Sequence, residues 1–169
     1  MTEALLESAT RALAGHGAFE EREGEYAVTT TPFDATVRVT AAGGTLSYRV
    51  LVTVPTLDAA VEGEAVAPVV QEGWFEAFER RLEHPGGATR VDPERPVVSL
   101  DLDACEVRVE IGFQTSRPAR GAEDAKALAD FVEGTYLQGV VPGYEYREPV
   151  AGLIQQAEDR SKGAGGPPI

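Results

Sequence analysis

Hydrophobic and polar residues alternate along two neighbouring stretches in the first third of the chain. Residues 34–41 and 45–55 carry an apolar residue at every second position, and the positions between them are mostly polar, with threonine, arginine and serine. Such alternation is typical of β-strands that bury one face. The Ala42-Gly43-Gly44 turn between the two stretches predicts a β-hairpin, and their polar second face predicts an antiparallel sheet that is covered on one side only.

The same alternation returns over residues 97–102 and 106–113, where it changes phase. Apolar residues are even-numbered before Asp103 and odd-numbered after it. A side-chain period of two cannot change phase within one regular strand. We therefore expect a turn or bulge at Asp103-Ala104-Cys105, started by an aspartate that hydrogen-bonds the nearby backbone.

Four other stretches carry apolar residues at helical spacing. They begin at Thr2 or Glu3, at about Ala67, at Gly121 and at about Pro149. With a further strand predicted over residues 25–31 and a loop over 55–65, the order is helix, three strands, helix, two strands, helix and C-terminal helix. This order predicts an α+β fold, with an antiparallel sheet of about five strands and helices packed on one face. We expect one domain over residues 1–160 and a disordered tail over residues 161–169.

Charge narrows the possible partners. The chain has 28 acidic and 15 basic residues, a formal net charge of −13, and only two lysines, Lys126 and Lys162. A surface of this sign repels phosphate backbones and anionic lipids, so we expect neither nucleic-acid nor membrane binding. Self-repulsion of this size is relieved by salt, which favours a protein from a salt-rich cytoplasm.

Chain length, cysteine content and the lack of long apolar stretches favour a cytoplasmic protein. A chain of 169 residues is long enough to bury a core in one domain, and its single cysteine allows no internal disulfide. The N-terminal stretch MTEALLESATRALAGHG carries acidic residues and no long apolar run, unlike a signal peptide. No stretch approaches the roughly 20 apolar residues that cross a bilayer. We therefore expect a cytoplasmic protein.

The stretch SLDLDACEVRVEI, residues 99–111, gathers the most candidate chemistry. A calcium loop would need further acidic residues, a glycine and a distal glutamate. A nucleophilic Cys105 would need a base, and the two histidines, His16 and His84, are both expected just after helices. A turn between strands is the favoured interpretation, and we expect no metal site, no cofactor and no catalytic residue.

Three segments resemble a haloarchaeal family of uncharacterised proteins: TTTPFDATVRV, RVLVTVPTLDAAVEGE and EGWFEAFERRLE. The predicted order of elements over residues 2–137 also resembles the fold of type III secretion chaperones and the related YbjN-like proteins. That second resemblance implies an antiparallel sheet backed by helices and subunits that often associate in pairs.

Two classes of function follow. The first is a non-enzymatic binding or chaperone-like module that holds a protein segment, as the fold resemblance implies. The alternative is a small-molecule-binding protein or enzyme whose pocket is lined by aromatic residues, with four candidates: Trp74, Tyr136, Tyr144 and Tyr146. Helical spacing of Trp74 and Phe78 favours a core position for both. We also expect a homodimer, because the 34–41 and 45–54 strands risk an open sheet edge and the late helix has two apolar flanks.

Overall fold

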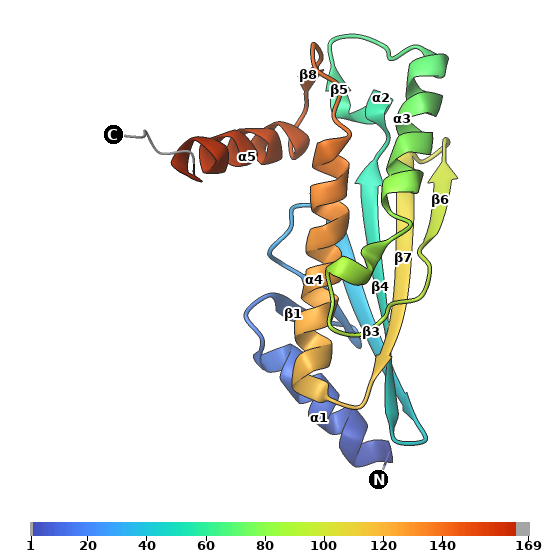
Figure 1. Ribbon diagram of the computed structural model, residues 1–169, viewed down its shortest axis with the longest axis vertical. Coiled ribbons are helices and arrows are strands. Elements are labelled where there is room, and N and C mark those ends of the chain that lie inside the picture. The colour runs from blue at the N-terminus through green and yellow to red at the C-terminus, as the bar shows by residue number, and fades with distance from the viewer. Residues whose placement is uncertain (1, 165–169) are drawn as a thin grey trace.

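A six-stranded antiparallel sheet in the order β1-β2-β3-β4-β7-β6 dominates the computed structural model, which describes residues 2–164 (Figure 1). A separate two-stranded sheet pairs β5 with β8. The strands are β1 (Phe19–Arg22), β2 (Glu25–Val28), β3 (Asp34–Ala42), β4 (Thr45–Pro55), β5 (Val61–Glu62), β6 (Val97–Asp101), β7 (Glu106–Thr115) and β8 (Glu145–Tyr146). The predicted α+β class is confirmed.

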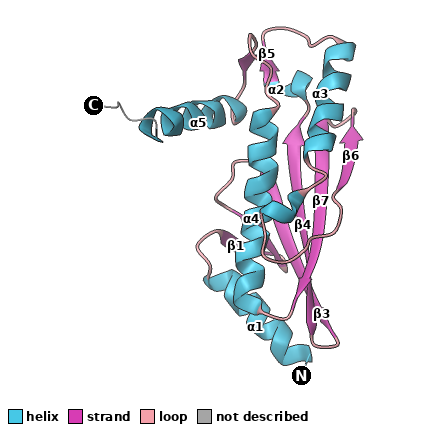
Figure 2. Ribbon diagram, viewed as in Figure 1, coloured by secondary structure: helices cyan, strands magenta, loops and turns pink. Residues whose placement is uncertain are grey.

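The chain has five α-helices between residues 2 and 164, and all but the last lie on one face of the large sheet (Figure 2). They are α1 (Thr2–Gly15), the short α2 (Leu57–Ala60), α3 (Pro68–Arg81), α4 (Pro118–Gln138) and α5 (Val150–Ala164), with a 3-10 turn at Pro85–Gly87. α4 packs against β4 and β7, and α1 packs against α4 and β3. α5 projects away from the sheet (Figure 1). Between residues 2 and 164, no helix combines the length and the apolar composition that a membrane span requires.

The two predicted hairpins form where the sequence places their turns. Gly43 and Gly44 join β3 to β4 with φ of 58° and 80°, the left-handed values that a tight hairpin turn requires. Between β6 and β7, the backbone N–H of Ala104 donates to Asp101 Oδ1 at 3.0 Å, and Cys105 has φ 56°. The phase change in the sequence therefore marks a turn.

The core lies between the sheet and the helices. Sheet residues such as Val37, Val50 and Val109 are fully buried, and α4 contributes Leu128 and Val132 from its inner face. Burial of one face of each strand is what the alternation predicted, and it stabilises the folded chain by roughly 25 cal/mol per Å² of apolar surface. The flank of α4 with Leu128 and Val132 is thus covered within one chain, whereas Phe131 on its other flank is half-buried.

Several predicted boundaries are wrong. α4 begins at Pro118 rather than Gly121, because a proline at the first helical position has no N–H to lose. The predicted loop over 55–65 contains α2 and β5, where Thr56 Oγ1 caps α2 by accepting from the Ala59 N–H. α5 extends to Ala164, so residues 161–164 of the predicted tail are helical; the rest of that tail lies outside the described residues.

Strand β1 was missed, and its position changes the expected edges. β1 has the sequence FEER, which shows no apolar alternation, and it pairs with β2 through a turn at Glu23 and Gly24, both with positive φ. The predicted hairpin strands, β3 and β4, are interior in the strand order, and β2 pairs with β3 through Tyr26 and Ala27. Neither hairpin strand ends the sheet, and self-association stays a prediction.

Candidate functional site

Two of the four aromatic candidates, Trp74 and Tyr136, lie together in the core. The Trp74 ring centre is 5.6 Å from that of Phe78 and 5.8 Å from that of Tyr136. The Tyr136 hydroxyl donates to the Pro55 carbonyl oxygen at 3.2 Å, and burial raises the pKa of Tyr136. Trp74 is 4% exposed and Tyr136 is 1% exposed, so both contribute to packing. The core position expected from the spacing of Trp74 and Phe78 is confirmed.

The other two candidates, Tyr144 and Tyr146, lie between α4 and α5 and are half-buried. The Tyr146 hydroxyl donates to the Val141 carbonyl oxygen at 2.7 Å and accepts from the Val141 N–H at 2.8 Å. This pair of bonds closes a local loop. None of the four aromatic candidates lines the groove described next. Ligand binding by these residues stays a prediction.

A groove with a volume of about 450 Å³ lies between α3 and β6. Its floor is apolar and includes Phe75 from α3 and Leu100 from β6, while acidic side chains stand at its rim. We call it the α3–β6 groove; it is lined by Asp58, Val66, Pro68, Gln71, Glu72, Phe75, Glu76, Leu100 and Leu102. An apolar floor with a polar rim is the general form of a binding surface.

The strand that borders this groove is an open edge of the sheet. β6 pairs with β7 on one side and, within residues 2–164, has no strand on the other (Figure 1). Within residues 2–164, five large hydrophobic side chains are exposed, and three of them belong to β6 or the turn after it. These three are Val97, Leu100 and Leu102, which are 57%, 37% and 63% exposed. This edge therefore combines unpaired backbone groups with apolar side chains.

The opposite edge of the same sheet is different. β1 ends the sheet on that side, and its last three residues, Glu20, Glu21 and Arg22, are charged and exposed. Charged side chains on an edge strand hinder pairing with another chain. One edge of the sheet is thus protected, and the edge beside the α3–β6 groove is open to a partner.

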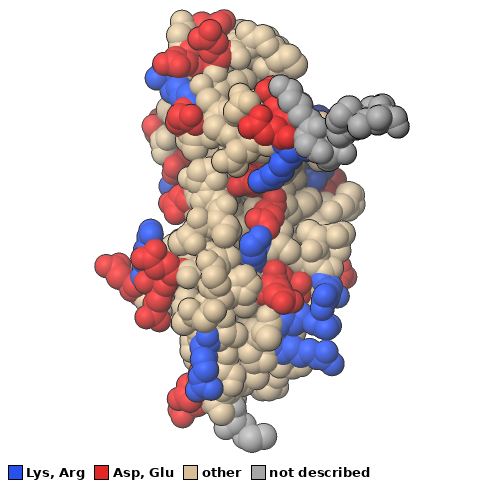
Figure 3. Space-filling view, turned by 90° about the vertical axis from the view of Figure 1, so that its left-hand side faces the viewer, with Lys and Arg blue, Asp and Glu red and all other residues tan. Residues whose placement is uncertain are grey.

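Two other surfaces show fewer features of a binding site. The exposed sheet face carries Arg38, Arg49 and Arg108, but each is paired with a carboxylate, from Glu25, Glu94 and Glu106 respectively. Arg38 and Arg49 are direct cross-strand neighbours, and these pairings offset their mutual repulsion. On the left-hand side of the molecule, acidic and basic side chains are interspersed (Figure 3). The three arginines of the exposed sheet face are thus each paired with a carboxylate.

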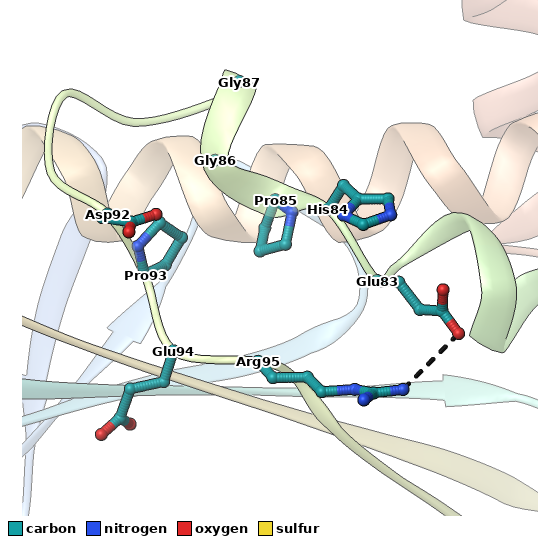
Figure 4. A pocket seen from close by; sticks show the side chains of 9 residues that line it. All are labelled: Glu83, His84, Pro85, Gly86, Gly87, Asp92, Pro93, Glu94 and Arg95. Atoms are coloured by element: carbon teal, nitrogen blue, oxygen red, sulfur yellow. Dashed lines mark ion pairs between the residues drawn. The ribbon is translucent and has the colours of Figure 1, made fainter.

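A second hollow lies in the loop between α3 and β6 (Figure 4). Glu83 and Arg95 form an ion pair of 3.6 Å across it, His84 is exposed, and Glu94 points away from Glu83. In the described part of the chain, no group of three or more His, Cys, Asp or Glu side chains is placed to hold a metal ion. The apolar lining of this hollow comes from Pro85 and Pro93, whereas the α3–β6 groove is lined by aromatic and leucine side chains.

Cys105 has a structural place in the β6–β7 turn. Its carbonyl oxygen accepts the Thr56 N–H at 3.0 Å, which ties the turn to the end of β4, and its thiol donates to the Leu102 carbonyl oxygen at 3.6 Å. His16 follows α1 as expected, and its Nδ1 accepts the Ala18 N–H at 3.2 Å. The expectation of a turn at Cys105 is confirmed.

Sequence reasoning missed the α3–β6 groove, although two signals for it are present. The first signal is an excess of apolar residues in one short strand: Val98, Leu100 and Leu102 alternate along one face, and Val97 lies on the other. One buried face does not accommodate all four side chains. In α3, Glu72, Glu76 and Glu79 repeat at helical spacing beside Phe75. Neither signal indicates that the two segments meet.

Comparison with known proteins adds a family but no activity. Residues 14–156 match DUF5813, which is described as a family of unknown function. No curated protein and no solved structure matches the chain.

Proposed function

The chain belongs to DUF5813, a family without a known function, and we propose from its surface that it is a non-enzymatic binding module. It holds an extended segment of a partner protein in the α3–β6 groove. The setting we propose is a salt-rich cytoplasm, which the net charge of −13 supports.

The open apolar edge of β6 carries this proposal. An extended segment that lies beside a sheet edge gains main-chain hydrogen bonds for its affinity and side-chain pockets for its specificity. β6 offers the first, because alternate residues of an edge strand direct their N–H and C=O groups outward. The groove offers the second, because Phe75 and Leu100 form an apolar surface directly beside that edge.

The test is a selection of random displayed peptides of about ten residues, an extended length that spans β6, on the full chain in about 2 M KCl. Two substitutions then locate the binding surface. Leu100→Gln alters the groove, and Leu51→Gln alters the opposite sheet face; these leucines are 37% and 36% exposed. The two variants therefore remove similar amounts of exposed apolar surface.

Selected peptides should bind the wild type and Leu51→Gln with equal affinity and bind Leu100→Gln roughly tenfold more weakly, because a buried leucine contributes about 1.5–3 kcal/mol. Circular dichroism confirms that both variants are folded. Equal binding to Leu100→Gln, or a selection that enriches no peptide, would reject the proposal.

A further inference from the structure

The α3 wall of the α3–β6 groove is acidic. Glu72 and Glu76 line the groove from successive turns of α3, Glu79 follows them on the helix beyond the groove lining, and all three are exposed. None of them forms an ion pair with a basic side chain in the described part of the chain. Their charge is thus available to a partner.

The floor beneath this wall is apolar. Phe75 is half-buried between Glu72 and Glu76 on α3, and Leu100 faces it from β6. A side chain that enters here meets carbon atoms along its stem and carboxylates at its end. Lysine and arginine meet both demands, because their methylene stems cover apolar surface while the charged group stays at the rim.

The register of β6 sets which positions of a partner reach the groove. Val98 pairs with Val109 and Leu100 pairs with Val107, and these two partners on β7 are buried beneath the helices. Val98 and Leu100 therefore face the helix side, whereas Val97 and Ser99 face the other side. Successive side chains of a strand added beside β6 would alternate in the same way, so every second residue would point toward α3.

Building on the proposed function, we infer that the partner segment is basic and extended. It is added beside β6 as a further strand, with lysine or arginine at the alternate positions that face α3. The unpaired edge determines its extended form, and the acidic wall over the apolar floor determines its side chains.

A second copy of the chain fits this groove poorly. Its own edge strand has the sequence VVSLD, which contains no basic residue. Two copies joined at β6 would also bring their acidic α3 walls toward each other, and like charges at short range oppose association.

The experiment uses the full chain and synthetic peptides of about nine residues, long enough to cover β6 with flanks on both sides. The first peptide alternates lysine and valine, the second replaces each lysine with glutamate, and the third is the lysine peptide with alternate backbone nitrogens methylated. Binding is measured by fluorescence anisotropy in about 0.3 M and about 2 M KCl, conditions that differ in electrostatic screening. Circular dichroism confirms that the chain is folded in both.

Two double variants separate the groove from the overall charge. Glu72→Gln with Glu76→Gln removes two charges from the groove wall, whereas Glu3→Gln with Glu7→Gln removes two exposed charges with the same spacing from α1. The net charge of the two double variants is equal, so a difference between them reports the position of the charges.

The lysine peptide should bind at least about tenfold more tightly than the glutamate peptide at the lower salt concentration. This preference should fall several-fold in the groove variant and remain in the α1 variant. Methylation should weaken binding about tenfold or more, because it removes the N–H donors that strand addition requires.

Several outcomes would overturn the inference. They are equal affinity for the lysine and glutamate peptides, equal losses in the two double variants, and no effect of methylation. The proposed function would survive these results if displayed peptides still lost affinity for Leu100→Gln, and it would fall with the inference if they did not. A dimer seen by sedimentation that Leu100→Gln converts to a monomer would show that a second copy occupies the groove.

Discussion

Alanine substitutions at Gly121 and Gly112 compare an added methyl group in a rigid site with one in a yielding site. At Gly121 on α4, the new Cβ would lie 2.6 Å from Tyr48 Cε1 and closer still to the ring's Cζ and hydroxyl oxygen. Carbon atoms in contact are about 3.5–4.0 Å apart, so the ring or the helix must move by about 1 Å. Tyr48 is 1% exposed and stacked on Phe113 at 4.8 Å, which leaves the ring no free space.

At Gly112 on β7 the added Cβ would meet the carboxylate end of Glu94 and lie 2.9 Å from Arg49 Nη1. These two side chains are about half exposed, at 55% and 53%, and form an ion pair of 3.1 Å. Both can swing into solvent. The substitution therefore disturbs one surface ion pair, which contributes about 0–1 kcal/mol, and gains about 0.5–1 kcal/mol from replacing a glycine in a strand.

The two losses should differ clearly. Overpacking at Gly121 costs about 3 kcal/mol, and the helical preference of alanine over glycine returns about 1 kcal/mol, so the net loss is about 2 kcal/mol. In a domain of this size that loss lowers Tm by roughly 4–8 °C, whereas Gly112→Ala should leave Tm nearly unchanged. Thermal and urea unfolding, followed by circular dichroism in about 2 M KCl, measure both.

A second substitution tests the cause. Tyr48→Leu removes the atoms that the new methyl group meets, so Gly121→Ala should cost less in the Tyr48→Leu background than in the wild type. Equal losses for Gly121→Ala and Gly112→Ala, or strictly additive losses in the double variant, would refute the packing argument.

Three further predictions concern buried hydroxyls, the turn and salt. The buried Tyr48 hydroxyl has no hydrogen-bond partner within residues 2–164, so Tyr48→Phe should keep or raise Tm, whereas Tyr136→Phe should lose about 1 kcal/mol with its bond to Pro55. Burial raises the pKa of Tyr48 to about 12, above the ordinary value of 10.0. An unfolded tyrosine ionises at a lower pH than the buried Tyr48, so the free energy of unfolding should fall as the pH rises above about 10. Tyr48→Phe should make this fall shallower, and an unchanged slope would contradict the role of Tyr48. Cys105 has φ 56°, so Cys105→Gly should gain up to about 1 kcal/mol in urea unfolding, and Cys105→Ser should preserve both fold and peptide binding; loss of binding would indicate a reactive thiol. Tm should rise between about 0.1 and 3 M KCl as salt screens the net charge of −13, and a flat profile would contradict this.

Local patterns were sufficient for the two main hairpins and the long helices. The alternation over residues 34–41 and 45–55, with Gly43-Gly44 between them, predicted the β3–β4 hairpin because side-chain period and turn geometry are properties of neighbouring residues. The phase change before Cys105 located the β6–β7 turn for the same reason. β1 escaped prediction because its polar residues pair through backbone bonds, which leave no hydrophobic pattern.

The sequence by itself thus determined the fold class, both hairpins and the positions of the main helices, since each depends on contacts within a few residues. Tertiary structure alone decided the order of the strands, and with it that β3 and β4 are interior while β6 is an edge. It also brought Tyr136 against Trp74 and Phe75 opposite Leu100. Alternation shows that a strand buries one face, but the neighbour that covers this face is chosen by hydrogen bonds and packing between residues far apart in the chain.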